Sequence, residues 1–212
     1  MTCFALALEL PEDYFLREMS PDDDDNGSAL SFNFFPSVEG RTVEEGGLRI
    51  SAHTDFEVLT LLFQSRPGLE ICPGKEIDGA ASAGAQLAER WTPADPLPGA
   101  ITCNLGDALQ YWTDGRLRST FHRVRVPRDG EFKGERISLA YFGNARLTTP
   151  LQGPRKRYPP VTFLDLLAKR LEKIPLPMDP LTGIVKADAV MRYHAVVAGP
   201  EVCEAAGAPA AA

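Results

Sequence analysis

Short apolar runs, separated by Gly, Pro and Asp residues, dominate the chain from residue 30 onward. The runs are rich in β-branched and aromatic residues, a composition that strands favour. They read LSFNFF, LRISA, VLTLLF, LEI, AITCN, FHRVRV and RISLAYF. Many short strands joined by turn residues are typical of an antiparallel sandwich or barrel. The pattern therefore predicts a mainly β fold.

One turn signal is specific enough to predict a connection. Thr113-Asp114-Gly115 follows the run Ala108–Trp112 and precedes the strand that contains His122. An Asp-Gly pair between two strands favours a tight hairpin turn. We therefore expect Ala108–Trp112 to be extended and to form a hairpin with the strand of His122.

Helical patterns lie on both sides of the β-rich region. Residues 4–19 have helical composition, and Pro11 divides them, so we expect two short helices there. Residues 161–173 place Phe163, Leu166, Leu167 and Leu171 on one helical face, with Thr162 as the N-cap. We expect this helix to pack across the sheet. Residues 74–90 are small and polar, which indicates an inserted loop with helix near Ala85–Arg90.

These patterns divide the chain into a helical lead-in at 1–29, a β-rich core at 30–150, a helical extension at 151–203 and a disordered tail at 204–212. The 212 residues, of which 44% are hydrophobic, suffice for one domain with its own core.

Charge and composition exclude several classes of function. A net charge of −7 provides no basic surface for nucleic acid. No apolar run is long enough to cross a membrane, and residues 1–10 lack the features of a signal peptide, so we expect a cytoplasmic protein. Its four cysteines are far apart, which indicates reduced thiols rather than disulfides or a zinc knuckle.

The candidate chemistry centres on two of the three histidines. His53 and Asp55 are two residues apart in an extended segment, so their side chains project to the same side. His122, on another strand, would complete a set of two imidazoles and one carboxylate. Such a set on one side of a metal leaves coordination positions open and suits Fe(II), whereas zinc fits it less distinctively. His194 has no partner motif, and we interpret it as structural.

A candidate anion site follows the metal ligands along the chain. Arg136 and Ser138 alternate on the next β run after His122, so they share one face of a strand. A guanidinium and a hydroxyl that converge can bind one carboxylate. Alternatively, Arg136 is an ordinary surface cation at the start of a strand.

With these residues in place, the sequence resembles the isopenicillin-N-synthase-like family of 2-oxoglutarate and Fe(II)-dependent dioxygenases. The resemblance runs from about Leu30 to Asn144 and includes FNFFP, AHTDFEVLTLL, GLEI, WTP, LPGAITCNLGDALQYWTDGRLRSTFHRV and RISLAYF, in order. It implies a double-stranded β-helix, or jelly roll, with flanking helices. It also implies that His53, Asp55 and His122 bind Fe(II), and that Arg136 and Ser138 bind the distal carboxylate of 2-oxoglutarate.

The resemblance implies an oxygenase that uses 2-oxoglutarate and O2 to hydroxylate or desaturate a small organic metabolite and releases succinate and CO2. Three departures keep alternatives open: Phe35 replaces a tyrosine that contacts the cosubstrate, the 74–90 loop is longer, and a leading segment of the family is absent. One alternative is an iron enzyme that needs no 2-oxoglutarate, although Arg136 and Ser138 argue against it. Another is an N-terminally truncated relative that binds metal with little or no turnover. A shortened chain would also expose a sheet edge, through which we expect self-association.

Overall fold

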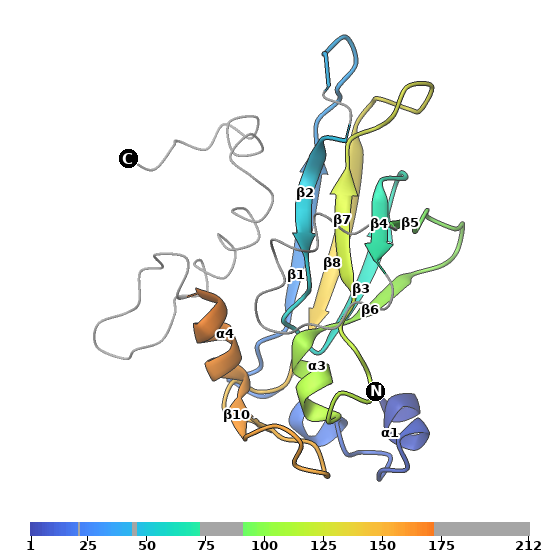
Figure 1. The fold of residues 1–212 in the computed structure, drawn as a ribbon. Coiled ribbons are helices and arrows are strands. Elements are labelled where there is room, and N and C mark those ends of the chain that lie inside the picture. Colours follow the sequence, from blue (N-terminus) through green and yellow to red (C-terminus); the bar gives the residue numbers. More distant parts are fainter. Residues whose placement is uncertain (21, 44–45, 73–90, 172–212) are drawn as a thin grey trace.

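The computed structural model describes residues 1–20, 22–43, 46–72 and 91–171. Its main feature is a pair of antiparallel four-stranded sheets that lie as two layers (Figure 1). In spatial order, the first sheet contains β1 (Ala29–Phe35), β8 (Arg136–Gly143), β3 (Leu59–Gln64) and β6 (Thr102–Leu105). The second contains β2 (Leu48–His53), β7 (Phe121–Arg125), β4 (Leu69–Cys72) and β5 (Thr92–Pro93).

The chain passes back and forth between the two sheets, because β1, β3, β6 and β8 belong to one layer and β2, β4, β5 and β7 to the other. Two facing antiparallel sheets, with eight strands in total and connected in this way, form a jelly roll, or double-stranded β-helix. The predicted fold class is therefore confirmed. The predicted strands also match the observed ones closely, because each is a short β-rich run between turn residues.

The first sheet has two chemically distinct faces. The face toward the second sheet carries buried residues of β8, Arg136, Ser138, Ala140 and Phe142, and buried Phe35 of β1. The other face is apolar but open, since Leu30, Phe32, Phe34, Phe63 and Tyr141 are between 39% and 65% exposed. The side-chain period of two thus separates an inner face, where Arg136 and Ser138 lie among apolar side chains, from an outer apolar surface.

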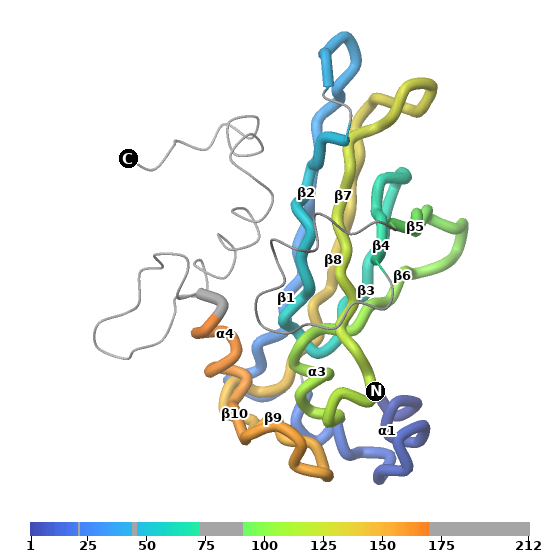
Figure 2. Tube along the Cα trace, in the orientation of Figure 1, coloured from blue at the N-terminus to red at the C-terminus, as the bar shows by residue number. Residues whose placement is uncertain are grey.

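The helices gather at one end of the two sheets (Figure 2). They are α1 (Thr2–Ala7), the 3-10 helix η1 (Leu16–Glu18), α3 (Asp107–Trp112) and α4 (Phe163–Leu171), beside the short pair β9 (Pro150–Leu151) and β10 (Val161–Thr162). A single cluster unites Ala5, Phe15, Trp112 and Phe163. The two short helical segments predicted on either side of Pro11 are confirmed.

The prediction of an extended Ala108–Trp112 was wrong. These residues belong to α3, and Ala108, Leu109 and Trp112 are its buried positions, which follow helical spacing. Asp114 and Gly115 do have positive φ values of 55° and 74°, but the turn that they form ends a helix. Burial of one helical face against Phe15 and its neighbours decided the structure over the turn signal.

The predicted helix near residues 161–171 is confirmed, with a different position in the fold. Thr162 and Asp165 form a capping box, in which the backbone N–H of Asp165 donates to Thr162 Oγ1 and that of Thr162 donates to Asp165 Oδ2. α4 packs with Phe56 and Leu151 at the end of the sheets and not across a sheet face, so that part of the prediction was wrong (Figure 1).

Several predictions concern residues outside the described part of the chain: the 74–90 loop with its helix near Ala85–Arg90, residues 172–173, His194 and the 204–212 tail. Within the described residues, no helix is long and apolar enough to cross a bilayer.

Candidate metal centre

Three side chains predicted to bind metal converge between the two sheets. His53, the last residue of β2, lies directly opposite His122 of β7 in the strand register, and Asp55 follows β2 by two residues. Asp55 Oδ1 lies 3.7 Å from His53 Nε2 and 3.4 Å from His122 Nε2. One potential ligand atom from each residue lies within 4.8 Å of the others. Two imidazole nitrogens and one carboxylate oxygen therefore face a common point.

The backbone orients both rings so that Nε2 faces the centre. His53 Nδ1 lies 2.8 Å from the carbonyl oxygen of Ser51, and His122 Nδ1 lies 3.1 Å from that of Thr120. A carbonyl oxygen can only accept a hydrogen bond, so each Nδ1 carries the proton. Nε2 of each ring, which faces Asp55, is therefore the nitrogen that can bind a metal once it carries no proton.

Asp55 is held so that one oxygen remains for a metal. Its Oδ2 accepts hydrogen bonds from Thr60 Oγ1 and from Asn104 Nδ2, both at 2.6 Å. Thr60 on β3 and Asn104 on β6 are partners in the strand register, so the two donors come from adjacent positions of the first sheet. The first sheet thus orients a carboxylate whose Oδ1 faces the histidines of the second.

The charges at the centre are strongly coupled. Burial raises the pKa of Asp55, but the two histidines and the hydrogen bond from Thr60 outweigh it and hold that pKa well below its usual range. Burial lowers the pKa of His122, and the Asp55 carboxylate outweighs this effect and raises the pKa above 6.5. Without a metal, the pocket therefore favours a proton on His122, which a divalent cation replaces on binding.

Helix α3 locks the loop that carries Asp55. The backbone N–H groups of Asp107 and Ala108 donate to the carbonyl oxygens of Asp55 and Phe56 at 2.8 Å and 3.2 Å. Gly106 precedes the helix, and a Cβ there would overlap the carbonyl oxygen of Glu57. The helix can approach this closely only because residue 106 is glycine.

Glu57 adds a buried acid to the pocket wall. Burial raises its pKa well above the usual value, and the negative charges of Asp55 and Asp107 raise it further.

The same pocket extends from the metal centre to Arg136 and Ser138, which both line it. Arg136 is 2% exposed, and its Nη2 and Nε donate to neutral acceptors, Gln64 Oε1 at 2.9 Å and the carbonyl oxygen of Arg66 at 3.3 Å. Its guanidinium carbon lies 4.8 Å from the ring centre of Phe35. Burial lowers the pKa of Arg136 to about 10, with a smaller contribution from the charge of Arg49, so Arg136 remains a cation near neutral pH.

One nitrogen of this buried cation lacks a partner in the protein. Arg136 Nη1 is buried and makes no hydrogen bond, and no described carboxylate lies within ion-pair distance of Arg136. A buried charge without a counter-ion is costly in a folded protein. The buried positive charge of Arg136 therefore favours binding of an anion inside the pocket.

Comparisons with known proteins agree with this geometry. The family model of the 2OG-Fe(II) oxygenase superfamily matches residues 26–145, a segment that contains all five predicted site residues. The chain belongs to this superfamily. Its relatives include proline hydroxylase buaE of Petromyces alliaceus, 38% identical over 146 residues that make up 68% of this chain and 41% of the relative. The 2-oxoglutarate-dependent dioxygenase frbA of Dothideomycetidae sp. is 37% identical over 149 residues, or 68% of this chain and 40% of that protein.

Solved structures share the fold. A full-length Neurospora crassa protein, solved in complex with alpha-KG and 5-formyluracil, superposes with a TM-score of 0.65 at 26% identity, and the match covers 82% of this chain and 54% of that one. JOX2, solved with 2OG, Fe and JA, gives a TM-score of 0.60 at 26% identity, and the match covers 81% of this chain and 46% of that one. The chain spans about two fifths of the length of the curated relatives that it matches.

The structure brings together the three residues that the sequence predicted as metal ligands, but sequence reasoning did not identify the residues that orient them. Thr60, Asn104 and Gln64 lie at inward positions of strands that are otherwise largely apolar. A polar residue at such a position is the signal that could have identified them, because buried polar groups need partners.

Proposed function

We propose that this chain carries the active site of a 2-oxoglutarate- and Fe(II)-dependent oxygenase that hydroxylates or desaturates a small organic metabolite and releases succinate and CO2. One observation carries the proposal: the pocket joins a converging His-Asp-His set at one end to a buried cation with an unpaired nitrogen at the other. A dicarboxylate that also binds a metal matches both ends. The names of the relatives favour this proposal over a non-catalytic metal-binding protein.

The donor set fits Fe(II). Nitrogen and oxygen donors without a thiolate suit this ion, and ligands from one side leave positions for a bidentate cosubstrate and for O2. When bound, the iron supplies the oxidative chemistry, in which the decarboxylation of 2-oxoglutarate is coupled to oxidation of the substrate. His53, Asp55 and His122 would hold it.

The protein's own residues bind and orient. Arg136 would pair with the distal carboxylate of 2-oxoglutarate through Nη1, and Ser138, which lies two residues further along the inner face of β8, would donate its hydroxyl to the same group. Phe35 supports the guanidinium with its ring face and buries it, a role that needs no hydroxyl. The missing tyrosine therefore leaves the anchor in place.

The cation at Arg136 also weighs against an iron enzyme that needs no 2-oxoglutarate. Such an enzyme would bury the positive charge of Arg136 with no cosubstrate to neutralise it. Its partners, Gln64 and the carbonyl of Arg66, are neutral and leave the charge in place.

Anaerobic titration of the Fe(II)-loaded protein with 2-oxoglutarate, followed by the charge-transfer absorption of the complex, tests binding. Release of labelled CO2 from 1-labelled 2-oxoglutarate then tests turnover. We expect stoichiometric binding and a slow release of CO2 even without the substrate. A chain that binds Fe(II) but produces no charge-transfer band with 2-oxoglutarate would contradict the proposal.

We also propose that the chain self-associates through the outer face of the first sheet, a different surface from the sheet edge that the sequence suggested. Rows of apolar residues cross this face: Leu30, Tyr141 and Leu61 form one row, and Phe32, Leu139 and Phe63 the next. Soluble monomers rarely expose so continuous an apolar surface. A second copy offers the same flat face, and two such faces can stack as sheets do in sandwiches.

A further inference from the structure

A second cavity lies next to Arg136, separate from the metal centre. Its volume is about 210 Å³, well above the roughly 10–15 Å³ that one water molecule needs. Arg49, Arg66, Arg125 and Arg136 line it together with Asp95 and Glu131. Of these residues, Arg136 alone also lines the metal pocket.

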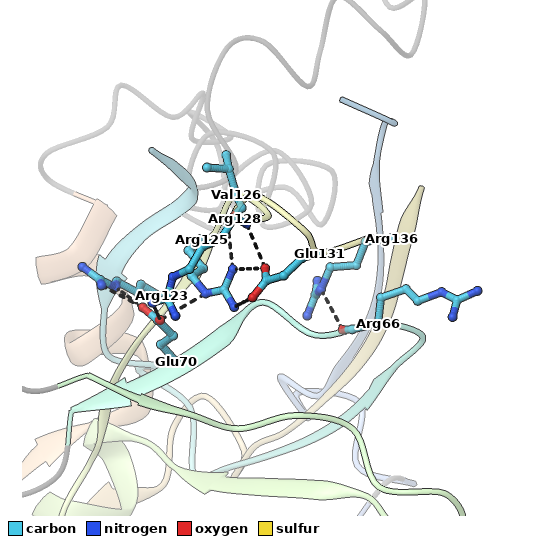
Figure 3. Close-up of polar contacts among 8 residues, drawn as sticks. All are labelled: Arg66, Glu70, Arg123, Arg125, Val126, Arg128, Glu131 and Arg136. Atoms are coloured by element: carbon cyan, nitrogen blue, oxygen red, sulfur yellow. Dashed lines mark hydrogen bonds and ion pairs between the residues drawn. The ribbon is translucent and has the colours of Figure 1, made fainter. Parts of the chain in front are cut away.

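The two carboxylates do not neutralise the four arginines evenly. Figure 3 shows that Glu131 lies against Arg125 and that Arg136 contacts Arg66. Arg125 forms an ion pair with Glu131 and donates two hydrogen bonds to its carboxylate, of 2.6 Å and 2.8 Å. Glu70, which is 1% exposed, is surrounded by Arg125, Arg123 and Arg128 at 2.7–3.1 Å. Arg125 is therefore paired with both Glu131 and Glu70, and Glu131 also accepts a hydrogen bond from the backbone N–H of Arg128.

The other three arginines have no carboxylate partner within ion-pair distance in the described part of the chain. Arg49 Nη2 donates to the carbonyl oxygen of Pro36 at 3.1 Å, and its guanidinium carbon lies 5.8 Å from the ring centre of Phe35. The guanidinium carbon of Arg66 lies 4.4 Å from the ring centre of Phe132. Arg136 contacts the neutral partners described above and keeps Nη1 unpaired.

Burial raises the energetic cost of placing these positive charges close together. Arg49 is half-buried, and burial lowers its pKa, while Arg136 is 2% exposed. Asp95, the remaining acid, is exposed. Like charges around a partly buried cavity repel one another unless an anion lies between them.

We propose that this cavity binds a small oxyanion, a phosphate or a carboxylate group, through Arg49, Arg66 and Arg136. Guanidinium groups bind oxyanions through paired, charge-assisted hydrogen bonds, which favours this class over chloride. Arg66 is exposed and stacks on the half-exposed Phe132, so it can turn toward a ligand without disturbing the core.

Arg136 couples this site to the metal pocket, and this consequence rests on the proposed function. An oxyanion in the second cavity reduces the positive charge that attracts the distal carboxylate of 2-oxoglutarate. The two anions therefore oppose each other, and each raises the dissociation constant of the other by the same factor.

The first experiment measures binding of inorganic phosphate to the metal-free protein by calorimetry, with ionic strength held constant by potassium chloride. We expect one phosphate per chain, and a loss of affinity of about tenfold or more in Arg49→Gln because a charge-assisted bond is lost. Arg41→Gln is the matched control, since Arg41 is exposed and does not line this cavity. Circular dichroism checks that both variants fold.

The second experiment titrates 2-oxoglutarate into the Fe(II)-loaded protein, without oxygen, at increasing phosphate. We expect the apparent dissociation constant of 2-oxoglutarate to rise with phosphate in the wild type and in Arg41→Gln, and to rise far less in Arg49→Gln.

The outcomes separate the two proposals. Absence of phosphate binding, or equal affinity in Arg49→Gln and the wild type, overturns the oxyanion site. Phosphate binding that leaves 2-oxoglutarate affinity unchanged overturns the shared use of Arg136. If phosphate binds as expected but 2-oxoglutarate does not bind at all, the oxyanion site stands and the proposed function fails.

Discussion

Replacing Thr60 by valine tests whether the first sheet prepares Asp55 for metal binding. Thr60→Val keeps the shape of the side chain and removes one of the two 2.6 Å hydrogen bonds to Asp55 Oδ2. Thr60 is 3% exposed, so water has little access to replace its hydroxyl. A hydrogen bond to a charged group contributes about 1.5–3 kcal/mol. Loss of such a supporting contact weakens metal binding by about 10- to 100-fold.

Calorimetric titration with Fe(II) under anaerobic conditions measures this effect. We expect Thr60→Val to bind Fe(II) at least about tenfold more weakly, whereas the control Thr60→Ser keeps the hydroxyl and stays close to the wild type. Because Thr60 and Asn104 donate to the same oxygen, Thr60→Val combined with Asn104→Leu should differ from the sum of the single effects. A folded Thr60→Val protein with wild-type affinity for Fe(II) would refute the argument.

Four further predictions follow from the same pocket and from the surface behind it. His122→Ala should lose stoichiometric Fe(II), which metal analysis after anaerobic loading and desalting will show; full retention would disprove the ligand set. Arg136→Gln should weaken 2-oxoglutarate by about 10- to 100-fold and leave Fe(II) affinity unchanged, and equal 2-oxoglutarate affinity would rule out the anchor. The raised pKa of His122 stabilises the metal-free protein below about 6.5, and this contribution is lost as pH rises through the folded-state value. The thermal midpoint of the metal-free protein should therefore fall over that range, and His122→Gln should abolish this fall. Phe32→Ser should shift light scattering toward the monomer across a concentration series, and a wild type that is monomeric at every concentration would exclude association through this face.

Sequence patterns predicted the strands better than their surroundings. The strands are short, largely apolar runs between turn residues, so their limits can be read locally. The order of strands within each sheet depends on contacts between distant segments, such as β1 with β8, and no local pattern encodes them. Residues 108–112 show the same limit, because contacts with Phe15 and with the other neighbours of Trp112 made them helical.

The candidate site also contains some residues that the sequence could indicate and others that it could not. The ligand set could be predicted because His53 and Asp55 are close in sequence and His122 is one of only two other histidines. Asn104 could not, since its role depends on β6 lying beside β3 and on the side chain pointing inward. The unpaired Nη1 of Arg136 is equally invisible in the sequence, because it results from neutral partners that the fold supplies.

One strand sets the spacing between the two ends of the pocket. Arg136 lies at the start of β8, and Phe142, near its end, is opposite Thr60, which holds Asp55. Six residues of extended chain span about 20 Å, and the arginine side chain and the metal ligands reach inward from the two ends. Between them, the inner face of β8 carries only Ser138 and Ala140, whose small side chains leave room along the strand. The pocket is therefore open where a short dicarboxylate would lie, and its two anion-binding ends are kept apart by a central strand that is hydrogen-bonded on both sides.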